Sequence, residues 1–372
     1  MIRLIIIIIL FLISLLAVFK AFEYHLWLLG IIVTEFPWVF STITLVLLLT
    51  GLWVNKYQLP GTVTGIIALL LFLSPIVRAY VVASSIRNNL AGSLDINPAN
   101  DDMPFSFWKM FKSNAKLPYK TITYVKYTDT NLSLDFYPSQ SMGKHPCIIV
   151  VHGGSWSGGD SKQLPELNSY LAAKGYNVAS INYRMAPKWQ TPAPVEDVKN
   201  ALDYLRAHAN ELYIDTNNFV LLGRSAGAQI ALLAAYTLHD KGLKGIIDFY
   251  GPADMVWGYS VPANLLIMDS RKVMVNYIGG TYAQVPEKYK ACSPIEFVDK
   301  ATVPTLIIHG DNDVLVSPEH SRRLDIKLQQ NGIKHYRLQP RWATHGFDFN
   351  LNGPGGQLST YAVEKFLSSV VD

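Results

Sequence analysis

One serine of this chain stands in a sequence setting that suits a nucleophile. Residues 223–227 read Gly-Arg-Ser-Ala-Gly; they follow the apolar run 219–222 and lead directly into an Ala- and Leu-rich segment. A serine on a tight turn between a strand and a helix projects its hydroxyl above the sheet, and the helix N-terminus favours negative charge there. Gly223 and Gly227 suit such a turn because they let the backbones approach closely. We therefore predict that Ser225 is a nucleophile.

A serine hydroxyl is a weak nucleophile, so it needs a general base and a carboxylate that orients the base. His345 stands in a loop after the last strand-like segment and is the predicted base. The acid is expected in the loop after the preceding strand, where 309–313 read His-Gly-Asp-Asn-Asp. We predict Asp313, at the tip of this loop, and keep Asp311 as the alternative. Other histidines fall in or beside predicted helices or at a strand start and are expected at the surface, namely His208, His239, His320 and His335.

Backbone amides that could stabilise an oxyanion are predicted at two places. The first is Ala226, the residue after the predicted nucleophile, whose amide opens a helix. The second is a His-Gly-Gly-Ser-Trp loop that follows an apolar strand-like run. There we assign the amides of Gly154 and Ser155 to oxyanion binding, with His152 and Gly153 as supporting turn residues. Each such donor contributes about 3–4 kcal/mol of transition-state stabilisation in known enzymes.

The elements that must hold these residues alternate regularly from residue 121 onward. Short apolar runs are typical of strands, and segments with apolar residues at helical spacing lie between them. The predicted strands are 121–128, 132–137, 147–151, 176–183, 219–222, 243–250, 304–309 and 336–339. The predicted helices are 164–174, 195–210, 226–238, 317–330 and 361–371. This alternation predicts an α/β fold with a mostly parallel sheet and helices on both faces, opened by one antiparallel hairpin.

The first ninety residues differ in composition from the rest. The whole chain is 50% hydrophobic and 16% charged, whereas soluble domains carry about 25% charged residues. Three charge-free segments account for much of the difference, namely 4–19, 37–54 and 61–77. We predict about three transmembrane helices in a membrane anchor over 1–83, because a cleaved signal peptide would need small residues after its apolar run. This predicts a multi-pass protein of the cell membrane. Its flanking Lys and Arg residues are almost evenly divided, so the side that carries the remaining chain stays open.

The rest of the chain divides into a polar linker over 84–118 and the α/β domain over 119–372. The aromatic stretch 104–111 could rest on lipid headgroups or pack on that domain, and both interpretations stay open. The domain is nearly neutral and has no basic run, which argues against a nucleic-acid partner. Cys147 and Cys292 cannot make a disulfide framework or a Cys-based zinc site; two buried thiols are expected, or at most one bridge. No metal or organic cofactor is implied.

Together these motifs resemble those of α/β-hydrolase serine esterases, in particular the hormone-sensitive-lipase-like and feruloyl-esterase-like (BD-FAE) carboxylesterases. The order Ser225, Asp313, His345 matches that fold family. With the predicted anchor, the resemblance implies a membrane-bound enzyme that cleaves carboxylic esters through an acyl-enzyme. Its partners would be a small or lipid-like ester and the lipid bilayer. The motifs that carry the resemblance lie between about residues 120 and 370 and are His152–Trp156, Asn182–Pro187, Glu196-Asp197, Gly223–Gly227, His309-Gly310 with Asp313, and His345–Phe347.

Several alternatives and departures accompany this resemblance. Amide-bond hydrolases of the peptidase or formamidase type share overlapping motifs, and acyltransferases share the acyl-enzyme but exclude water. A non-catalytic binding module would be expected to lack a triad residue, and none is missing. Arg224 stands where the family usually has Asp or Glu, and we expect this cation to alter the leaving-group site or the preferred substrate charge. Residues 251–300 are expected to form a lid or pocket insert, whose aromatic residues either line the pocket or pack within the insert, namely Trp257, Tyr259, Tyr277 and Tyr282.

Overall fold

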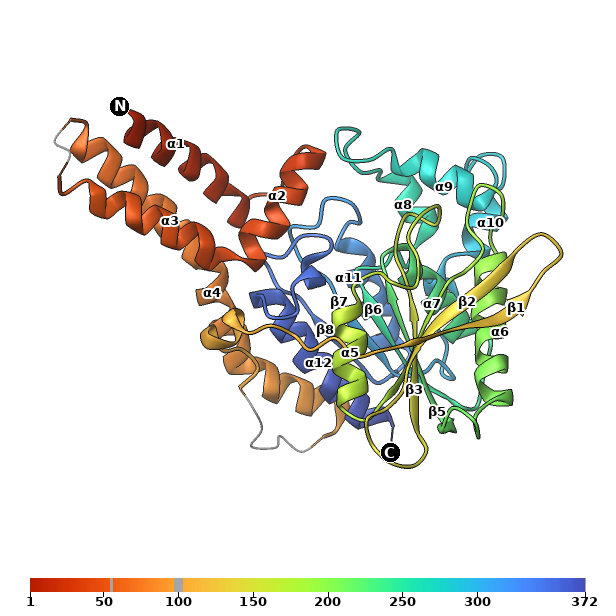
Figure 1. Ribbon diagram of the computed structural model, residues 1–372. Coiled ribbons are helices and arrows are strands. Elements are labelled where there is room, and N and C mark those ends of the chain that lie inside the picture. Colours follow the sequence, from red (N-terminus) through yellow and green to blue (C-terminus); the bar gives the residue numbers. More distant parts are fainter. Residues whose placement is uncertain (54–55, 97–102, 372) are drawn as a thin grey trace.

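The computed structural model describes residues 1–53, 56–96 and 103–371, and its centre is one twisted eight-stranded sheet (Figure 1). The strand order is β1-β2-β4-β3-β5-β6-β7-β8. The β1–β2 and β2–β4 pairs are antiparallel and the other pairs are parallel, as the alternation of strands and helices predicts. The strands are β1 (Lys120–Lys126), β2 (Asn131–Tyr137), β3 (His145–Val151), β4 (Asn177–Ile181), β5 (Ile214–Arg224), β6 (Leu243–Phe249), β7 (Thr305–Ile308) and β8 (His335–Leu338).

Helices cover both faces of this sheet because its central strands are apolar on both sides. In β3, Ile149 and Val151 belong to one hydrophobic core, and Ile148 and Val150 belong to the other. The first core is closed by α6 (Ala193–Ala207), α7 (Ala226–Thr237) and α11 (Glu319–Gln330). The second core is closed by α5 (Pro165–Ala173), α12 (Pro354–Val370) and the carboxyl-terminal half of α4 (Gln58–Leu94).

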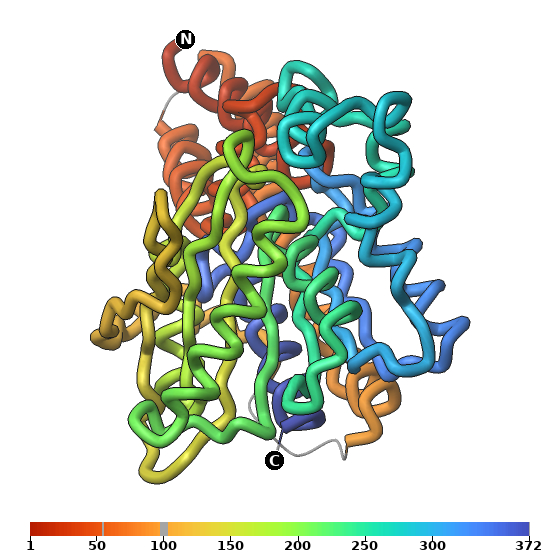
Figure 2. The backbone as a smooth tube through the Cα atoms, turned by 90° about the vertical axis from the view of Figure 1, so that its right-hand side faces the viewer, coloured from red at the N-terminus to blue at the C-terminus, as the bar shows by residue number. Residues whose placement is uncertain are grey.

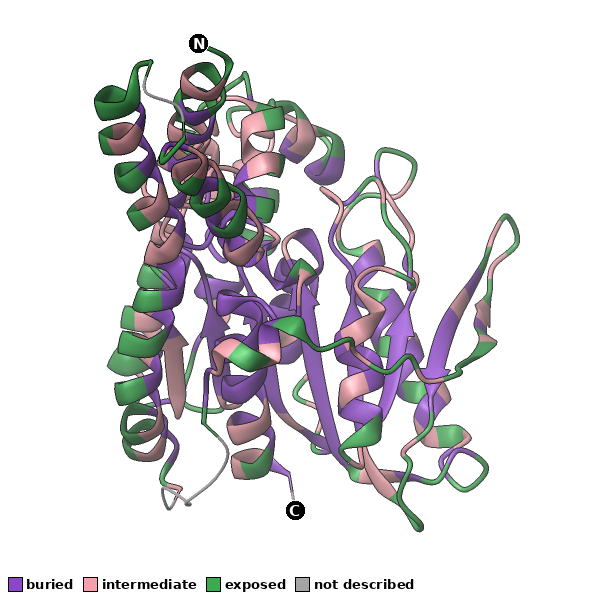
Figure 3. Ribbon diagram, turned by 60° about the vertical axis from the view of Figure 1, so that its left-hand side comes forward, coloured by how far each residue is buried: buried purple, intermediate pink, exposed green. Residues whose placement is uncertain are grey.

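The amino-terminal helices project from this domain as a separate apolar bundle (Figures 1 and 3). It consists of α1 (Ile2–Ser14) with the 3₁₀ turn Leu15–Ala17, α3 (Pro37–Thr50) and the first half of α4. Leu10, Ala68 and Phe72 are buried inside it. The helix α2 (Tyr24–Glu35) turns away from α3 by 83° and packs on the α/β domain.

The prediction of three transmembrane helices is not confirmed. Among the described residues, α4 alone is long and apolar enough to cross a membrane, and the bent pair α2–α3 is a second candidate only if it counts as one span. The predicted first span, 4–19, corresponds to α1 and its 3₁₀ turn, which together are shorter than a full crossing. Val54, the last residue of the predicted second span, lies outside the described residues.

The predicted linker is more ordered and more closely attached to the domain than its polar composition indicates. Helix α4 continues through Leu94, far beyond the predicted end of the third span, because its last turns bury Ile86 and Leu90 against the sheet domain. Phe105 and Met110 enter the same core, whereas Trp108 is exposed. The aromatic stretch therefore contacts the domain through some of its side chains. Residues 97–102 of the predicted linker lie outside the described residues.

The insert between β6 and β7 lies over the carboxyl ends of the parallel strands. Its helices are α8 (Met255–Ser260), α9 (Ser270–Ile278) and α10 (Pro286–Ala291), followed by the 3₁₀ turn Pro294–Phe297. Figure 2 shows this insert, in teal and cyan, at the same end of the molecule as the amino-terminal helices, in red, and opposite the C-terminus. The loops that follow β3, β5, β7 and β8 all emerge beneath the insert, so their side chains can meet there.

Candidate active site

Ser225 occupies the tight turn that its sequence setting predicts. Strand β5 ends at Arg224 and α7 begins at Ala226, which leaves one residue for the turn, with φ 54° and ψ −123°. A non-glycine residue adopts such a conformation only where the surroundings enforce it. A Cβ atom at Gly227 would overlap the carbonyl oxygens of Val151 and His152, so glycine allows α7 to pack against the end of β3.

The structure brings Ser225, His345 and Asp313 together in one chain of hydrogen bonds. The Oγ atom of Ser225 lies 2.9 Å from Nε2 of His345, and Nδ1 of His345 lies 2.7 Å from Oδ2 of Asp313. When Nδ1 donates to the carboxylate, Nε2 is free to accept the serine proton. Asp311, the alternative acid, accepts a hydrogen bond from Gln339 instead and does not contact His345.

The carboxylate of Asp313 is almost fully buried and is held by four donors. Its Oδ1 accepts from the amides of Leu315 and Val316, each at 2.9 Å. Its Oδ2 lies 3.1 Å from Nε2 of His309 as well as facing His345. Burial by itself would raise the pKa of Asp313, but the charge of His345 and the hydrogen bonds from both histidines outweigh burial and lower it. The acid therefore stays ionised at neutral pH.

The amides predicted to hold an oxyanion border the same place. The structure, over the residues it describes, gives the amides of Gly154, Ser155 and Ala226 no hydrogen-bond acceptor. The amide of Gly153 donates to Oε1 of Gln163 at 2.7 Å, which agrees with its assignment to the turn. Gly154 has φ 121°, and a Cβ there would overlap the carbonyl of residue 158, so this loop conformation requires glycine.

His152 supports the loop rather than facing the reacting atoms. Its Nδ1 lies 2.7 Å from the carbonyl oxygen of Gly153, and its ring stacks on Tyr183 at 4.3 Å between centroids. The hydroxyl of Tyr183 donates to the carbonyl of His152 at 3.1 Å. Burial lowers the pKa of His152, so its imidazole is neutral at neutral pH.

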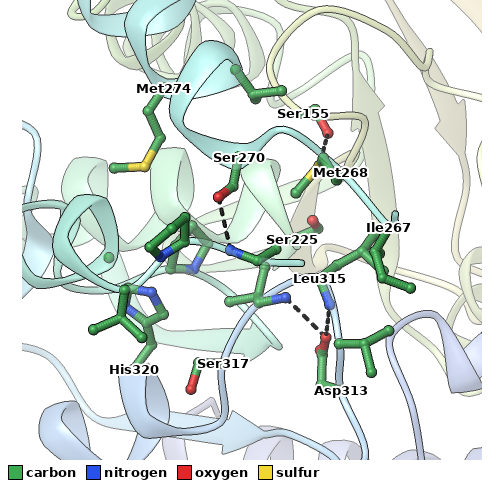
Figure 4. A pocket seen from close by; sticks show the side chains of 18 of the residues that line it. Ser155, Ser225, Ile267, Met268, Ser270, Met274, Asp313, Leu315, Ser317 and His320 are labelled. Carbon is green, nitrogen blue, oxygen red and sulfur yellow. Dashed lines mark hydrogen bonds between the residues drawn. The ribbon is translucent and has the colours of Figure 1, made fainter. Parts of the chain in front are cut away.

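Two cavities meet at Ser225. The first, of about 290 Å³, extends under the insert and is mostly apolar; Figure 4 shows Ile267, Met268, Met274 and Leu315 around Ser225. The second, of about 390 Å³, lies between the loop that carries Gly153–Ser155 and helix α2, where Trp27 and Tyr24 form part of its wall. An ester carbon held at Ser225 therefore has a separate space for each of its two substituents.

The aromatic residues predicted for the insert pack against one another or against neighbouring elements and line neither of these two cavities. Tyr277 stacks on Trp156 with 4.5 Å between the ring centroids, and Tyr259 and Tyr282 both contact Tyr289. The cavity beneath the insert is lined by methionines and aliphatic side chains instead. Trp257 contacts the ring of His320, at 4.9 Å between centroids.

The expectation that His320 lies at the surface is wrong. Its side chain is buried at the inner end of the first cavity, and its Nδ1 accepts from the amide of Asp254 at 3.2 Å. Burial is the main cause that lowers the pKa of His320 to about 3. Helix α11 is amphipathic, and His320 lies on its inward face. Histidine is a polar residue type, so its identity alone does not show that it faces inward.

Arg224, the cation next to Ser225, is buried and paired with a carboxylate. Its side chain is 2% exposed, and its Nε donates to Oδ2 of Asp348 at 2.5 Å. The other carboxylate oxygen of Asp348 accepts from the hydroxyl of Tyr250, whose ring lies 4.4 Å from that of His345. The guanidinium of Arg224 is therefore paired with Asp348 inside the protein, where it supports the loop that carries His345, and Arg224 also borders the second cavity.

Two further contacts at the site were not predicted from the sequence. Trp27, from the amino-terminal helix α2, donates from Nε1 to the carbonyl oxygen of His345 at 3.0 Å. His309 donates to Asp313, while its Nδ1 lies 2.6 Å from Oγ of Ser321. The sequence motif His309-Gly310 had drawn attention to His309, although not to its contact with Asp313. Trp27 stands in an apolar stretch with no signal of its own.

The comparison with known families agrees with this geometry. The model of the BD-FAE family matches residues 134–328, just over half of the chain. The chain belongs to the BD-FAE family. The matched region includes Ser225 and Asp313 and stops before His345, and it leaves the amino-terminal helices outside.

Curated relatives of this BD-FAE chain include esterases of Mycobacterium tuberculosis (strain ATCC 25618 / H37Rv). Esterase LipC is 30% identical over 240 residues, which are 60% of this chain and 58% of LipC. The probable carboxylic ester hydrolase LipM is 27% identical over 266 residues, which are 67% of this chain and 60% of LipM. The chain thus spans somewhat more than half the length of these relatives.

Solved structures show the fold to be that of the α/β-hydrolase esterases. EstE1, a thermophilic carboxylesterase cloned from a metagenomic library, aligns with a TM-score of 0.60 and 18% identity, covering 79% of this chain and 97% of EstE1. A bacterial heroin esterase aligns with a TM-score of 0.60 and 21% identity, covering 71% of this chain and 88% of that enzyme. The predicted mostly parallel sheet is confirmed.

Proposed function

We propose that this protein is a membrane-anchored serine hydrolase that cleaves carboxylic esters. The observation that carries the proposal is the hydrogen-bonded chain of Ser225, His345 and Asp313 at the meeting point of two cavities, beside unpartnered amides. The esterase relatives and membership of the BD-FAE family support ester hydrolysis.

The reaction follows from the positions of these groups. Ser225 Oγ attacks the acyl carbon while Nε2 of His345 takes its proton, and the carbonyl oxygen becomes an oxyanion. The amides of Gly154, Ser155 and Ala226 donate to that oxyanion. His345 returns the proton to the departing alcohol, which leaves an acyl-enzyme. Water then loses a proton to His345 and attacks the acyl carbon, which releases the carboxylic acid and restores Ser225.

The two cavities divide the ester between them. The mostly apolar cavity under the insert suits the acyl chain, because methionine and aliphatic side chains make up much of its walls, with polar residues such as Ser270 and Ser317 between them. The cavity beside α2 is left for the alcohol part; its walls are also mostly apolar, with Trp27 and Ile31 among them, and Gln163 is one of its polar side chains. This arrangement supports an ester with an apolar acyl group as substrate.

The surface of the amino-terminal bundle supports anchoring in a bilayer. Only 33% of the most apolar 18-residue window of α4 is buried, unlike the core helix of a soluble protein. The outer faces of all three bundle helices are apolar, and green residues follow these faces in Figure 3. A soluble protein rarely exposes so much contiguous apolar surface. The exposed apolar side chains include Ile5, Ile9, Leu12, Ile43, Val46, Leu49, Val63, Ile67 and Leu70.

The proposed activity is tested with the full chain in detergent micelles and p-nitrophenyl esters of increasing acyl length. Ser225→Ala should lower kcat by about 10⁴-fold or more, since loss of the nucleophile leaves only binding and oxyanion stabilisation. Ser368→Ala, an exposed serine in α12, is the matched control and should leave kcat unchanged. A fluorophosphonate probe should label the wild type and the control but not Ser225→Ala. Activity of Ser225→Ala within about tenfold of the wild type would refute the proposed mechanism.

A further inference from the structure

Two segments that are far apart in the sequence meet at the mouth of the apolar cavity. They are residues 18–24, which connect the bundle to α2 and include its first residue, and residues 261–268, between α8 and α9; we call them the entrance rim. The amide of Tyr24 donates to the carbonyl of Leu266 at 3.1 Å, and Nδ2 of Asn264 donates to the carbonyl of Phe22 at 3.3 Å. The amino-terminal region is therefore hydrogen-bonded to the insert that covers Ser225.

The entrance rim carries large apolar side chains that face solvent. Phe19, Phe22 and Leu266 are each more than 60% exposed, and Leu265 is 76% exposed. None of these four side chains lines the cavity, so they form an outer surface around its mouth. An exposed patch of this kind in a folded protein marks a surface that contacts an apolar partner.

This outer surface continues directly into the apolar bundle. Helix α1 and its 3₁₀ turn end at Ala17, and the entrance rim begins with the next residue. Figure 2 shows the bundle and the insert at the same end of the molecule. A bilayer that surrounds the bundle therefore ends close to the entrance rim, at the depth where aromatic side chains such as Phe19 and Phe22 can enter its interface.

The cavity connects this surface with the nucleophile. Lys20 and Ala21 line it at the rim together with Ala263 and Asn264, and Ser225 lines it at the other end. The walls between them are mostly apolar, with Met255 and Ile267 among them and Ser270 as a polar member. Because Lys20 is exposed, the cavity is open at the rim rather than closed inside the protein.

We propose that the substrate is an ester of a membrane lipid, whose acyl chain passes from the bilayer between the two segments of the entrance rim into the apolar cavity. This inference rests on the proposed ester hydrolysis at Ser225 and adds the substrate class and its route. An acyl chain on this route stays in mostly apolar surroundings from the bilayer to Ser225, so its transfer reduces its exposure to water. The ester group itself stops at the amides of Gly154, Ser155 and Ala226.

The test compares a lipid-dissolved ester with a water-soluble ester on the same protein. The full chain is reconstituted in phosphatidylcholine vesicles that contain a long-chain umbelliferyl ester, and p-nitrophenyl acetate is added from the aqueous phase in a parallel assay. The test variant is Leu265→Asp with Leu266→Asp, because both side chains are exposed and lie outside the cavity lining. The matched control is Met142→Asp with Tyr213→Asp. These two exposed apolar residues stand just before β3 and β5, at the amino ends of the parallel strands, whereas the insert lies over their carboxyl ends.

We expect the test variant to hydrolyse the vesicle-borne ester at least about tenfold more slowly than the wild type, because two carboxylates hold the rim out of the apolar interface. Hydrolysis of p-nitrophenyl acetate should stay within about twofold for both variants, since neither changes the reacting groups. An unchanged rate on the vesicle-borne ester, or an equal loss on both esters, would overturn the proposed route. A wild type that hydrolyses neither ester would instead refute the proposed function.

A second measurement does not depend on the aspartate variant folding well. Cys147 and Cys292 are buried, so a cysteine introduced as Leu265→Cys can be labelled selectively with an environment-sensitive fluorophore. A lipid that carries a nitroxide in its upper acyl chain should quench this label, whereas aqueous iodide should not. The label in Met142→Cys should show the reverse. Quenching of the Leu265→Cys label by iodide alone would place the entrance rim in water and overturn the inference.

Discussion

The exchange Asp313→Asn tests how the buried acid acts on His345. The new side chain has one oxygen and one NH₂ group in place of two carboxylate oxygens. The amides of Leu315 and Val316 are fixed donors, each 2.9 Å from Oδ1, so the amide oxygen of Asn must face them. Its NH₂ group then faces Nδ1 of His345, which lies 2.7 Å from Oδ2 in the wild type.

This orientation reverses the tautomer of the His345 imidazole. With an NH₂ donor opposite, Nδ1 of His345 must accept, so the ring proton moves to Nε2 and points at Ser225 Oγ. The ring can then no longer take the serine proton. The same change in a known serine protease lowers kcat by about 10⁴-fold, which corresponds to about 5.4 kcal/mol in the activation free energy. We expect a loss of this size here.

The assay is kcat for p-nitrophenyl butyrate at neutral pH, with the thermal unfolding midpoint measured on the same samples. The matched control is Asp311→Asn, the same chemical change two residues away in the same loop. Because the carboxylate of Asp311 contacts Gln339 and not His345, this control should keep kcat within about threefold. A loss below about tenfold in a folded Asp313→Asn protein, or a larger loss in Asp311→Asn, would refute the reasoning.

Three more predictions follow from buried groups near the site. Arg224→Met leaves the carboxylate of Asp348 buried without its cation and should lower the thermal midpoint by roughly 6–20 °C. Adding Asp348→Asn should recover more than half of this loss. Calorimetry measures both midpoints, and a double variant that is no more stable than Arg224→Met would contradict the pairing. His320 has a folded pKa of about 3, below its ordinary value of about 6.5, so its contribution to stability is present above pH 6.5 and is lost as the pH falls from there towards 3. Between pH 7 and 5 the wild type should therefore lose about 2 kcal/mol more than His320→Asn does, and equal slopes of unfolding free energy against pH would exclude this cause. Gly227→Ala should displace α7 from the end of β3 and lower the free energy of unfolding by about 1–3 kcal/mol. The thermal midpoint and kcat should both fall as a result. An unchanged midpoint would show that the turn tolerates a Cβ.

The order of strands and helices was predictable because it depends on local patterns. The central strands β3, β6 and β7 and the second half of β5 are largely short apolar runs, and many turns between elements carry glycine, proline or asparagine. The sequence motifs likewise identified Ser225, Asp313 and His345, which lie far apart in the chain and meet in the structure. The carboxyl ends of parallel strands share one edge of the sheet, so motifs placed directly after such strands converge there.

The contacts that depend on the packing of distant segments were not predictable. The first turn of α12 begins with Pro354, Gly355 and Gly356, a poor helix-forming stretch, and the sequence pattern predicts the helix only from residue 361. In the structure Oε2 of Glu35 accepts from the amides of Gly355 and Gly356, at 2.9 and 3.4 Å, and so supports the helix start. A carboxylate more than three hundred residues away leaves no local signal for this role.

The sequence by itself determined the proposed chemistry, since residue types and their positions after apolar strands predict a serine nucleophile, its base, its acid and the glycines around them. Only the tertiary structure decided what surrounds that chemistry. It placed Trp27 against the loop of His345, paired Arg224 with Asp348, and left three apolar helices as a bundle where the sequence predicts three full spans. The physical reason is that a local pattern indicates only the spacing of hydrophobic residues and the geometry of turns. Ion pairs, the lengths of the apolar helices and the walls of cavities depend instead on which distant surfaces come together.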